Sequence, residues 1–212
     1  TPRGFRTPYA FFHRFLGGFG ASAIGNYMTW GSDGFDEEEK SEFLFEAAGQ
    51  STEEYLANHY RSLVDLDPMS RFMAIDFLSG MADCLLVKVD IATMAQSIEG
   101  RSPFLDHRLI EWACSIDRRD LVCGFEGKPI LRELAKKYLP AEIVSAPKRG
   151  FEIPLVDWTT GPLRQMIGDL CLNKNGIVGQ LFHYQKIDGL MNGKTNMGAE
   201  RRARRLWLLL ML

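Results

Sequence analysis

The sequence has no apolar run long enough to cross a membrane and no excess of charge of one sign. Its longest uninterrupted apolar stretch, Leu206–Leu212, contains seven residues, whereas a transmembrane helix needs about 20. Twenty-five Lys and Arg oppose 27 Asp and Glu, giving a formal charge of −2, so no overall positive field would attract a nucleic acid. We therefore expect a soluble folded protein without membrane or nucleic-acid partners.

Cysteine and histidine are too few and too scattered to form a metal centre from neighbouring residues. Gaps of 30, 9 and 48 residues separate the four cysteines, which are Cys84, Cys114, Cys123 and Cys171, and zinc or dithiol motifs need closer pairs. The four histidines include no pair four residues apart. We expect no metal ligands, free thiols that pack in the core, and a cytoplasmic location.

Valine is scarce relative to leucine, and this balance predicts the fold class. The chain has 25 Leu and 9 Met against 7 Val, which favours helices over strands. Segments with the spacing of strand–helix–strand units are not found. We predict a mainly α protein, one helical domain over residues 1–212, that lacks a parallel nucleotide-binding sheet.

Several helix starts can be predicted from capping residues. The N-cap candidates are Ser51, Asp67 and Asp106, of types that accept a hydrogen bond from the first helical turn. The acidic run Asp36-Glu37-Glu38-Glu39 also indicates a helix start, because carboxylates are favourable at a helix N-terminus. Further helices are predicted over 128–139 and from Gly161-Pro162 onward. The cluster Arg201-Arg202-Arg204-Arg205 is predicted to be a solvated helix face.

Two glycine-containing stretches partly resemble phosphate-binding loops, but each lacks a residue that the loop motif requires. Ser79-Gly80-Met81-Ala82-Asp83 lacks the second glycine of a pyrophosphate loop and follows a helical rather than a strand pattern. Gly17-Gly18-Phe19-Gly20 lacks the Lys-Ser/Thr of a P-loop. We assign neither to phosphate binding.

Two segments carry the most informative polar residues. Asp90 lies in an apolar helical pattern, where a carboxylate needs a partner or a polar cleft. Glu99 and Arg101 follow, and an ion pair that fixes the chain before Pro103 is the favoured interpretation for them, with a functional role as the alternative. The loop over residues 145–154 contains Lys148-Arg149-Gly150 and shows no helical pattern, as is common for functional loops.

These segments resemble the C-terminal synthetase domain of glutamine-dependent asparagine synthetases. The matching motifs, in family order, are Val89-Asp90, Met94-Ala95, Glu99-x-Arg101-x-Pro103-Phe104-Leu105-Asp106, Lys128-x-Ile130-Leu131-Arg132, Leu139-Pro140, and Lys148-Arg149-Gly150-Phe151-Glu152-Ile153-Pro154 with Trp158. The resemblance is clear over residues 60–160, extends to closing helices over 161–212, and is weak over 1–60. It implies the helical C-terminal half of an adenine-nucleotide α-hydrolase-like (ATP pyrophosphatase) synthetase domain.

The chain also departs from the family pattern. Ile91 stands where the family usually has Arg, Thr93 replaces Ser and Gly100 replaces Val. The glutaminase domain, the pyrophosphate loop and an acidic glycine-rich segment would lie before Thr1. We therefore expect a fragment that is inactive alone, with ATP and Mg²⁺ bound mainly by the part before Thr1.

The resemblance implies that ATP activates the side-chain carboxylate of aspartate and that glutamine-derived ammonia then displaces AMP. It assigns Lys148 as the catalytic lysine at the phosphate groups and Asp90 as an acidic residue near it. Arg149, Gly150, Arg101 and Glu99 would bind substrate or nucleotide. The implied partners are these small molecules and the glutaminase domain of the same protein, and assembly as a homodimer is left open.

Two alternatives remain at this point. The first is a paralogous amidotransferase that acts on a sugar-acid or peptide carboxylate, which the Ile91 departure leaves open. The second is a helical interaction module without catalysis.

Overall fold

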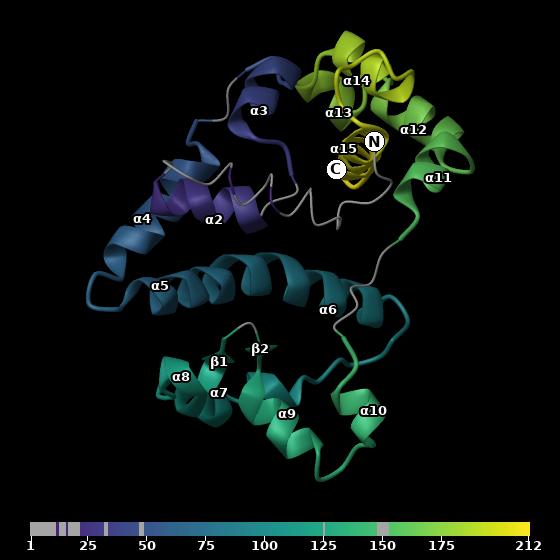
Figure 1. Ribbon diagram of the computed structural model, residues 1–212. Coiled ribbons are helices and arrows are strands. Elements are labelled where there is room, and N and C mark those ends of the chain that lie inside the picture. Colours follow the sequence, from purple (N-terminus) through teal and green to yellow (C-terminus); the bar gives the residue numbers. More distant parts are fainter. Residues whose placement is uncertain are drawn as a thin grey trace. The chain divides into compact units, whose positions relative to one another are not determined.

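The structure, a computed structural model, describes residues 12, 16, 22–31, 34–46, 49–124, 126–147 and 153–212. These residues are mainly helical, as the composition predicts (Figure 1). Their only strands are the two-residue antiparallel pair β1 (Val122–Cys123) and β2 (Glu126–Gly127). Among the described residues no helix is both long and apolar enough to cross a membrane.

The chain divides into two compact units. Unit 1 contains Thr1–Met81 and Ile153–Leu212, and unit 2 contains Ala82–Glu152. The helices of unit 1 whose bounds the structure describes include α2 (Ala23–Gly31), α3 (Glu37–Phe43), α4 (Thr52–Ser62), α5 (Pro68–Ile75), α11 (Leu155–Thr160), α12 (Arg164–Cys171), α13 (Ile177–Leu181), α14 (Tyr184–Met191) and α15 (Ala199–Leu210).

The predicted N-caps are confirmed. Ser51 accepts a hydrogen bond from the Glu54 amide at 3.0 Å. The sequence predicts Asp36 only as part of an acidic helix start, and the structure adds that it is the N-cap of α3 and accepts a hydrogen bond from the Glu39 amide at 2.8 Å. Asp67 precedes Pro68, the first residue of α5, and accepts a hydrogen bond from the Met69 amide at 3.0 Å. Each cap satisfies an amide that has no partner within its helix.

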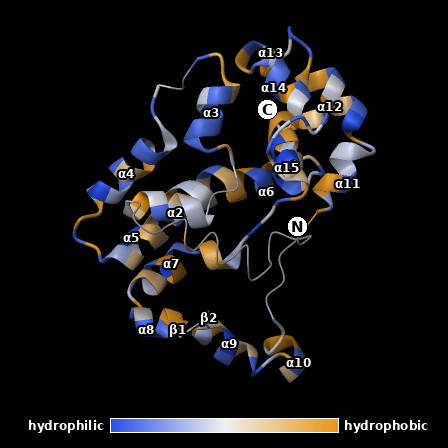
Figure 2. Ribbon diagram, turned by 45° about the horizontal axis from the view of Figure 1, so that its top comes forward, coloured by the Kyte–Doolittle hydropathy of each residue, from blue (hydrophilic) through white to orange (hydrophobic). Residues whose placement is uncertain are grey.

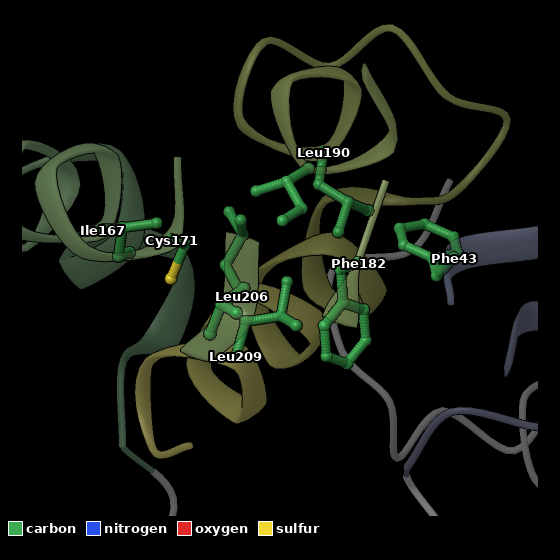
Figure 3. Packing of buried hydrophobic residues seen from close by; sticks show 9 residues of the cluster. Phe43, Ile167, Cys171, Phe182, Leu190, Leu206 and Leu209 are labelled. Carbon is green, nitrogen blue, oxygen red and sulfur yellow. The ribbon is translucent and has the colours of Figure 1, made fainter. Parts of the chain in front are cut away.

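The main core of unit 1 surrounds α15. Helices α11, α12 and α14 pack against it, and hydrophobic and hydrophilic residues are interspersed along these helices (Figure 2). Buried side chains from α3, α12, α14, α15 and the segment before α14 point toward one another (Figure 3). The labelled members are Phe43, Ile167, Cys171, Phe182, Leu190, Leu206 and Leu209.

An ion pair inside unit 1 corrects the prediction of a solvated arginine face. Arg205 is only 4% exposed and donates hydrogen bonds to Glu39 Oε2 from Nε at 3.0 Å and from Nη2 at 2.6 Å. Arg201 binds Glu39 Oε1 at 3.1 Å and Asp36 Oδ2 at 2.8 Å. The prediction fails for Arg205 because its carboxylate partner lies 166 residues away.

The carboxyl group of Glu39 stays ionised because its partners outweigh its burial. Burial by itself raises the pKa of Glu39, but hydrogen bonds from Arg205, from the Asp36 amide and from Arg201 together lower it by more. The pKa of Glu39 is therefore below its ordinary value. The same side chain closes the capping box of α3, since Glu39 Oε2 accepts the Asp36 amide at 3.1 Å.

A smaller core joins α2, α4 and α5. Its buried members are Ile24, Leu56 and Ile75. Tyr27 stacks on Phe72 with ring centroids 5.4 Å apart and donates its hydroxyl hydrogen to Asp76. Burial, followed by the Asp76 contact, raises the pKa of Tyr27 above its ordinary value.

The helix that begins at Pro68 continues through an unusual segment. After α5 the chain forms a π-helix, η1 (Asp76–Leu86), and then α6 (Val87–Met94). Ser79 and Gly80 lie inside η1, so the helical rather than strand pattern predicted before these residues is confirmed. π-Helical turns are rare in proteins, and those that occur are frequently found at functional sites.

Unit 2 contains α6, the 3₁₀ turn η2 (Pro103–Leu105) and short helices around the β1–β2 pair. These helices are α7 (His107–Cys114), α8 (Arg118–Leu121), α9 (Pro129–Ala135) and α10 (Ala141–Val144). Helix α9 is thus shorter than the predicted 128–139 helix. No residue of this unit whose burial is described is fully buried. Its apolar side chains, such as Ile91 at 64% and Phe104 at 63%, are largely exposed.

The cysteine prediction holds in one respect and fails in another. Cys84, Cys114 and Cys171 are free thiols, as expected, but only Cys171 is buried. Burial also raises the pKa of the Cys171 thiol. Cys84 and Cys114 are exposed because they belong to unit 2, where the described residues form no buried core.

Candidate active-site segment

Asp90 lies in the middle of α6 and its side chain is exposed. The neighbouring residues are apolar, as the sequence shows, but they do not bury Asp90, because Val89 and Ile91 are themselves 46% and 64% exposed. The carboxylate therefore carries no burial penalty in unit 2. Its position leaves it accessible to a ligand or to another charged group.

A left-handed residue ends α6 and turns the chain toward Glu99. Ser97 has φ 56°, and its amide donates to the Met94 carbonyl at 2.9 Å, while the Ile98 amide donates to the Thr93 carbonyl at 3.0 Å. This pair of bonds is the Schellman arrangement that satisfies the last carbonyls of a helix. It fixes the direction in which the chain leaves α6.

Glu99 and Arg101 form the ion pair favoured by the sequence. Arg101 Nε lies 2.8 Å from Glu99 Oε1, and Arg101 Nη2 lies 3.2 Å from Glu99 Oε2. Both side chains are exposed, at 82% for Arg101 and 69% for Glu99. An exposed pair of this kind contributes less than about 1 kcal/mol, so it defines local geometry more than stability.

Gly100 lies beside α6, and a side chain at this position would make ordinary van der Waals contacts with it. A Cβ at this position would lie 3.4 Å from Thr93 Oγ1 and 3.8 Å from Val89 Cγ1. Thr93 is itself held, because its hydroxyl donates to the Val89 carbonyl at 2.9 Å. The two departures Thr93 and Gly100 are therefore neighbours in space.

Asp106 starts α7 as predicted. It accepts hydrogen bonds from the Arg108 amide at 3.0 Å and from the Arg108 guanidinium at 2.8 Å. The Arg108 guanidinium, followed by the Arg108 amide, holds the pKa of Asp106 below its usual range. The Pro103–Asp106 motif is thus a turn and helix cap.

Lys128 and Arg132, at the two ends of the Lys128–Arg132 motif, have unusual local roles. Lys128 is the residue before α9 and has φ 64° and ψ 43°, in the left-handed region. Arg132, on α9, donates from Nη1 to the Val144 carbonyl at 2.6 Å. The sequence shows both residues as ends of a family motif but predicts a role for neither, since the motif encodes neither the conformation of Lys128 nor the contact of Arg132.

Replacing Lys128 by glycine is expected to stabilise the chain by about 0.5–1 kcal/mol, because glycine adopts the left-handed conformation without a Cβ clash. Lys136→Gly is the matched control, since Lys136 has φ −58° at the end of α9 and the same change there should destabilise by a similar amount. Urea unfolding measures both. A loss of stability in Lys128→Gly equal to that in the control would contradict the expectation.

The remaining predicted site residues lie outside the part of the chain that the structure describes. These are Lys148, Arg149 and Gly150, together with Phe151 and Glu152. The flanking residues are described: Ser145 and Ala146 close α10, and Trp158 on α11 packs on Trp207 of α15 with ring centroids 6.0 Å apart.

The described residues do not gather a set of metal ligands. No group of three or more His, Cys, Asp and Glu side chains in this part of the chain could hold a metal ion. Of the predicted site residues, unit 2 places Asp90, Glu99 and Arg101 on α6 and the turn that follows it.

Comparison with known proteins gives a consistent picture. The family model for asparagine synthase matches residues 24–212. The chain is 30% identical over 155 residues to a putative glutamine-hydrolysing asparagine synthetase of Mycobacterium tuberculosis H37Rv, a match that covers 71% of this chain and 23% of that protein. It is 26% identical over 102 residues to glutamine-hydrolysing asparagine synthetase 1 of Bacillus subtilis, covering 48% of this chain and 16% of that protein.

A relative with another name also matches. The chain is 27% identical over 124 residues to amidase chry2 of Gibberella zeae, covering 53% of this chain and 18% of that protein. The chain therefore spans less than a quarter of the length of these curated relatives. No solved structure matches.

Proposed function

The chain belongs to the asparagine synthase family, and on this basis we propose that it forms the C-terminal part of an ATP-dependent amidoligase. The proposed reaction is adenylation of the side-chain carboxylate of aspartate, followed by attack of glutamine-derived ammonia and release of AMP. ATP, Mg²⁺, aspartate and ammonia are the proposed small-molecule partners, and a glutaminase domain is the proposed source of ammonia.

One observation carries the proposal: the family motifs stand in family order over a match that spans residues 24–212. The exposed apolar side chains of unit 2, such as Ile91 and Phe104, fit a unit that other parts of a synthetase complete. The adenine-nucleotide α-hydrolase-like fold and the inactivity of this chain alone belong to the same proposal, because the sequence has no complete phosphate loop.

Lys148 has the central role in the proposed chemistry. Both steps concentrate negative charge on phosphate and acyl oxygens, and a preorganised cation stabilises that charge more in the transition state than in the ground state. The lysine ammonium is compact and has three donors, so it would bind these oxygens. Arg149 and Gly150 would bind nucleotide beside it.

Residues on and after α6 would complete the site. Asp90, exposed on α6, would orient Lys148 or accept a proton from the incoming amine. Glu99 and Arg101 would contribute to substrate binding as a preformed pair, since their side chains are already 2.8 Å apart. Bound Mg²⁺ would neutralise phosphate charge during the first step.

A second candidate, amidation of another carboxylate such as a sugar acid or peptide, rests on two observations. Ile91 stands where the family usually has arginine, which removes a cation from α6. One relative is named an amidase rather than an asparagine synthetase. In this second candidate the adenylation step is the same and only the carboxylate that is activated differs.

Carboxylate-dependent exchange of pyrophosphate into ATP by the complete protein tests the proposal. Aspartate should stimulate the exchange, and asparagine should form when ammonium is added. Exchange with other carboxylates but not with aspartate would favour the second candidate. If none of the carboxylates tested stimulates the exchange, both enzymatic assignments are refuted and a non-catalytic helical module remains.

A further inference from the structure

Unit 2 has helices, but its described residues do not close a core. Every side chain of this unit whose burial is described is exposed or half-buried, although a stable unit needs buried apolar surface to offset the entropy that the chain loses on folding. Ile91 on α6, Trp112 on α7 and Ile143 on α10 are all more than half exposed. The described part of unit 2 therefore lacks a surface that covers its apolar side chains.

On helix α6 the most exposed apolar side chains share one side. Val87, Ile91 and Met94 are 48%, 64% and 55% exposed. Since successive residues of an α-helix are rotated by about 100°, these three side chains fall within an arc of about 60°. They form one apolar stripe along the helix, the α6 stripe.

The opposite side of α6 is covered by the chain itself. Thr93 is the one half-buried residue of this helix, and Gly100 lies beside Thr93 and Val89. The turn that follows α6 therefore returns along Val89 and Thr93. Helical spacing places these two residues roughly opposite the α6 stripe, so the turn leaves the stripe open.

Two charged residues border the α6 stripe. The same helical spacing places Lys88 along one edge of the stripe and Asp90 along the other. Asp90 is the exposed carboxylate to which the proposed function gives a role. Whatever covers the stripe therefore comes to lie beside Asp90.

The proposed function requires a partner with a matching surface. The chain spans less than a quarter of the length of its curated relatives, and adenylation needs a phosphate-binding part, whereas this sequence has no complete phosphate loop. Parts of proteins that bind nucleotides are commonly built on a parallel sheet, whose two apolar faces are covered by helices. An exposed helix with an apolar stripe is the complement that such a face requires.

We propose that the α6 stripe is the docking face for the nucleotide-binding part of the complete protein. The proposal rests on the function proposed above and names the partner that completes the site: an apolar face of the nucleotide-binding sheet covers Val87, Ile91 and Met94, and Asp90 lies at the edge of the contact. Unit 2 obtains from this partner the burial that its own residues do not supply.

Photochemical cross-linking in the complete protein tests the contact directly. Ile91 is replaced by the photoreactive amino acid p-benzoylphenylalanine, and mass spectrometry identifies the peptide to which it becomes bound. We expect a peptide within the nucleotide-binding part of the same molecule. The control carries the same amino acid at Val89, where it should cross-link to the turn over residues 98–101 instead.

Hydrogen exchange of the complete protein gives a second measurement. Ile91→Lys should speed the exchange of peptides that cover α6 by at least about tenfold, because a cation would have to enter an apolar contact, whereas Ile91→Leu should change it little. Met211→Lys is the matched control, since Met211 is an equally exposed apolar residue of unit 1, at 67%, and it should leave the exchange of α6 unchanged.

Both measurements detect the contact and not the catalysis. A complete protein that gives the expected cross-link but no carboxylate-dependent pyrophosphate exchange would refute the proposed reaction and keep the docking face. Cross-links from position 91 only to residues 1–212 or to a second copy, or none where the Val89 control gives its own, would overturn the docking face even in an active protein. Unchanged exchange of α6 in Ile91→Lys would overturn it as well.

Discussion

Lys148→Ala in the complete protein is expected to lower the rate of carboxylate-dependent pyrophosphate exchange by at least about 10²–10³-fold. The reason is that one donor aimed at developing negative charge contributes on this scale to a transition state. Glutamine hydrolysis should continue, since it would use a separate cysteine nucleophile. Lys148→Arg should retain part of the exchange, because it keeps the charge but changes the shape of the donor.

A matched substitution separates loss of this ammonium from a general loss of charge. Lys174 lies in an exposed turn of unit 1, and Lys174→Ala should leave exchange and asparagine formation unchanged. Equal activity of Lys148→Ala and the unmodified protein would remove Lys148 from the mechanism. Asp90→Asn should reduce the rate less than Lys148→Ala if Asp90 orients the lysine.

Breaking the buried pair Glu39–Arg205 is expected to destabilise unit 1 by about 3–5 kcal/mol. Glu39→Ala removes the carboxylate that accepts two hydrogen bonds from Arg205, which is 4% exposed, and breaking a buried pair by removing one partner costs this much. Replacing both residues by leucine and methionine should recover most of the stability, because the double change removes both desolvation costs. Urea unfolding of the single and double variants measures the difference.

A control for this experiment lies on the same helix. Glu42, also on α3, forms an ion pair with Lys186 of α14 at 2.9 Å, but the side chains are 51% and 44% exposed. Glu42→Ala should therefore cost less than about 1 kcal/mol. A loss in Glu42→Ala as large as that in Glu39→Ala would show that burial does not set the strength of these pairs.

The Glu39 contribution should also depend on pH in a defined direction. The pKa of Glu39 is lower in the folded chain than its ordinary value, so its stabilisation is fully present above the unfolded pKa, about 4.3. It is lost as the pH falls through the folded pKa. Unfolding measured from pH 7 to pH 3 should therefore show a steeper acid loss in the unmodified protein than in Glu39→Ala.

The sequence predicted more residues of the candidate site than the structure describes. The pairing of Glu99 with Arg101 could be predicted because the residues are two apart and the chain turns before Pro103. The exposure of Asp90 could not, since it depends on what covers α6. Lys148, Arg149 and Gly150 were indicated by their position in a loop without a helical pattern, and their roles came from the order of family motifs; they lie outside the described residues.

The sequence by itself determined the helical class, the family and the helix starts. Asp36, Ser51, Asp67 and Asp106 act on amides two or three residues away, so the signal and its effect lie in the same short stretch. Hydrophobic periodicity predicts helices for the same reason: the pattern and the helix that it predicts lie in the same few turns of the chain.

Only the tertiary structure decided which charged residues are structural. Arg205 is buried rather than solvated because α15 packs beside α3, which brings Glu39 from 166 residues away. Arg132 reaches Val144 across a turn that no local pattern specifies. A charge in sequence carries no record of its partner, and the free energy of burying it depends on that partner, so the role of each arginine is settled only when the helices have packed.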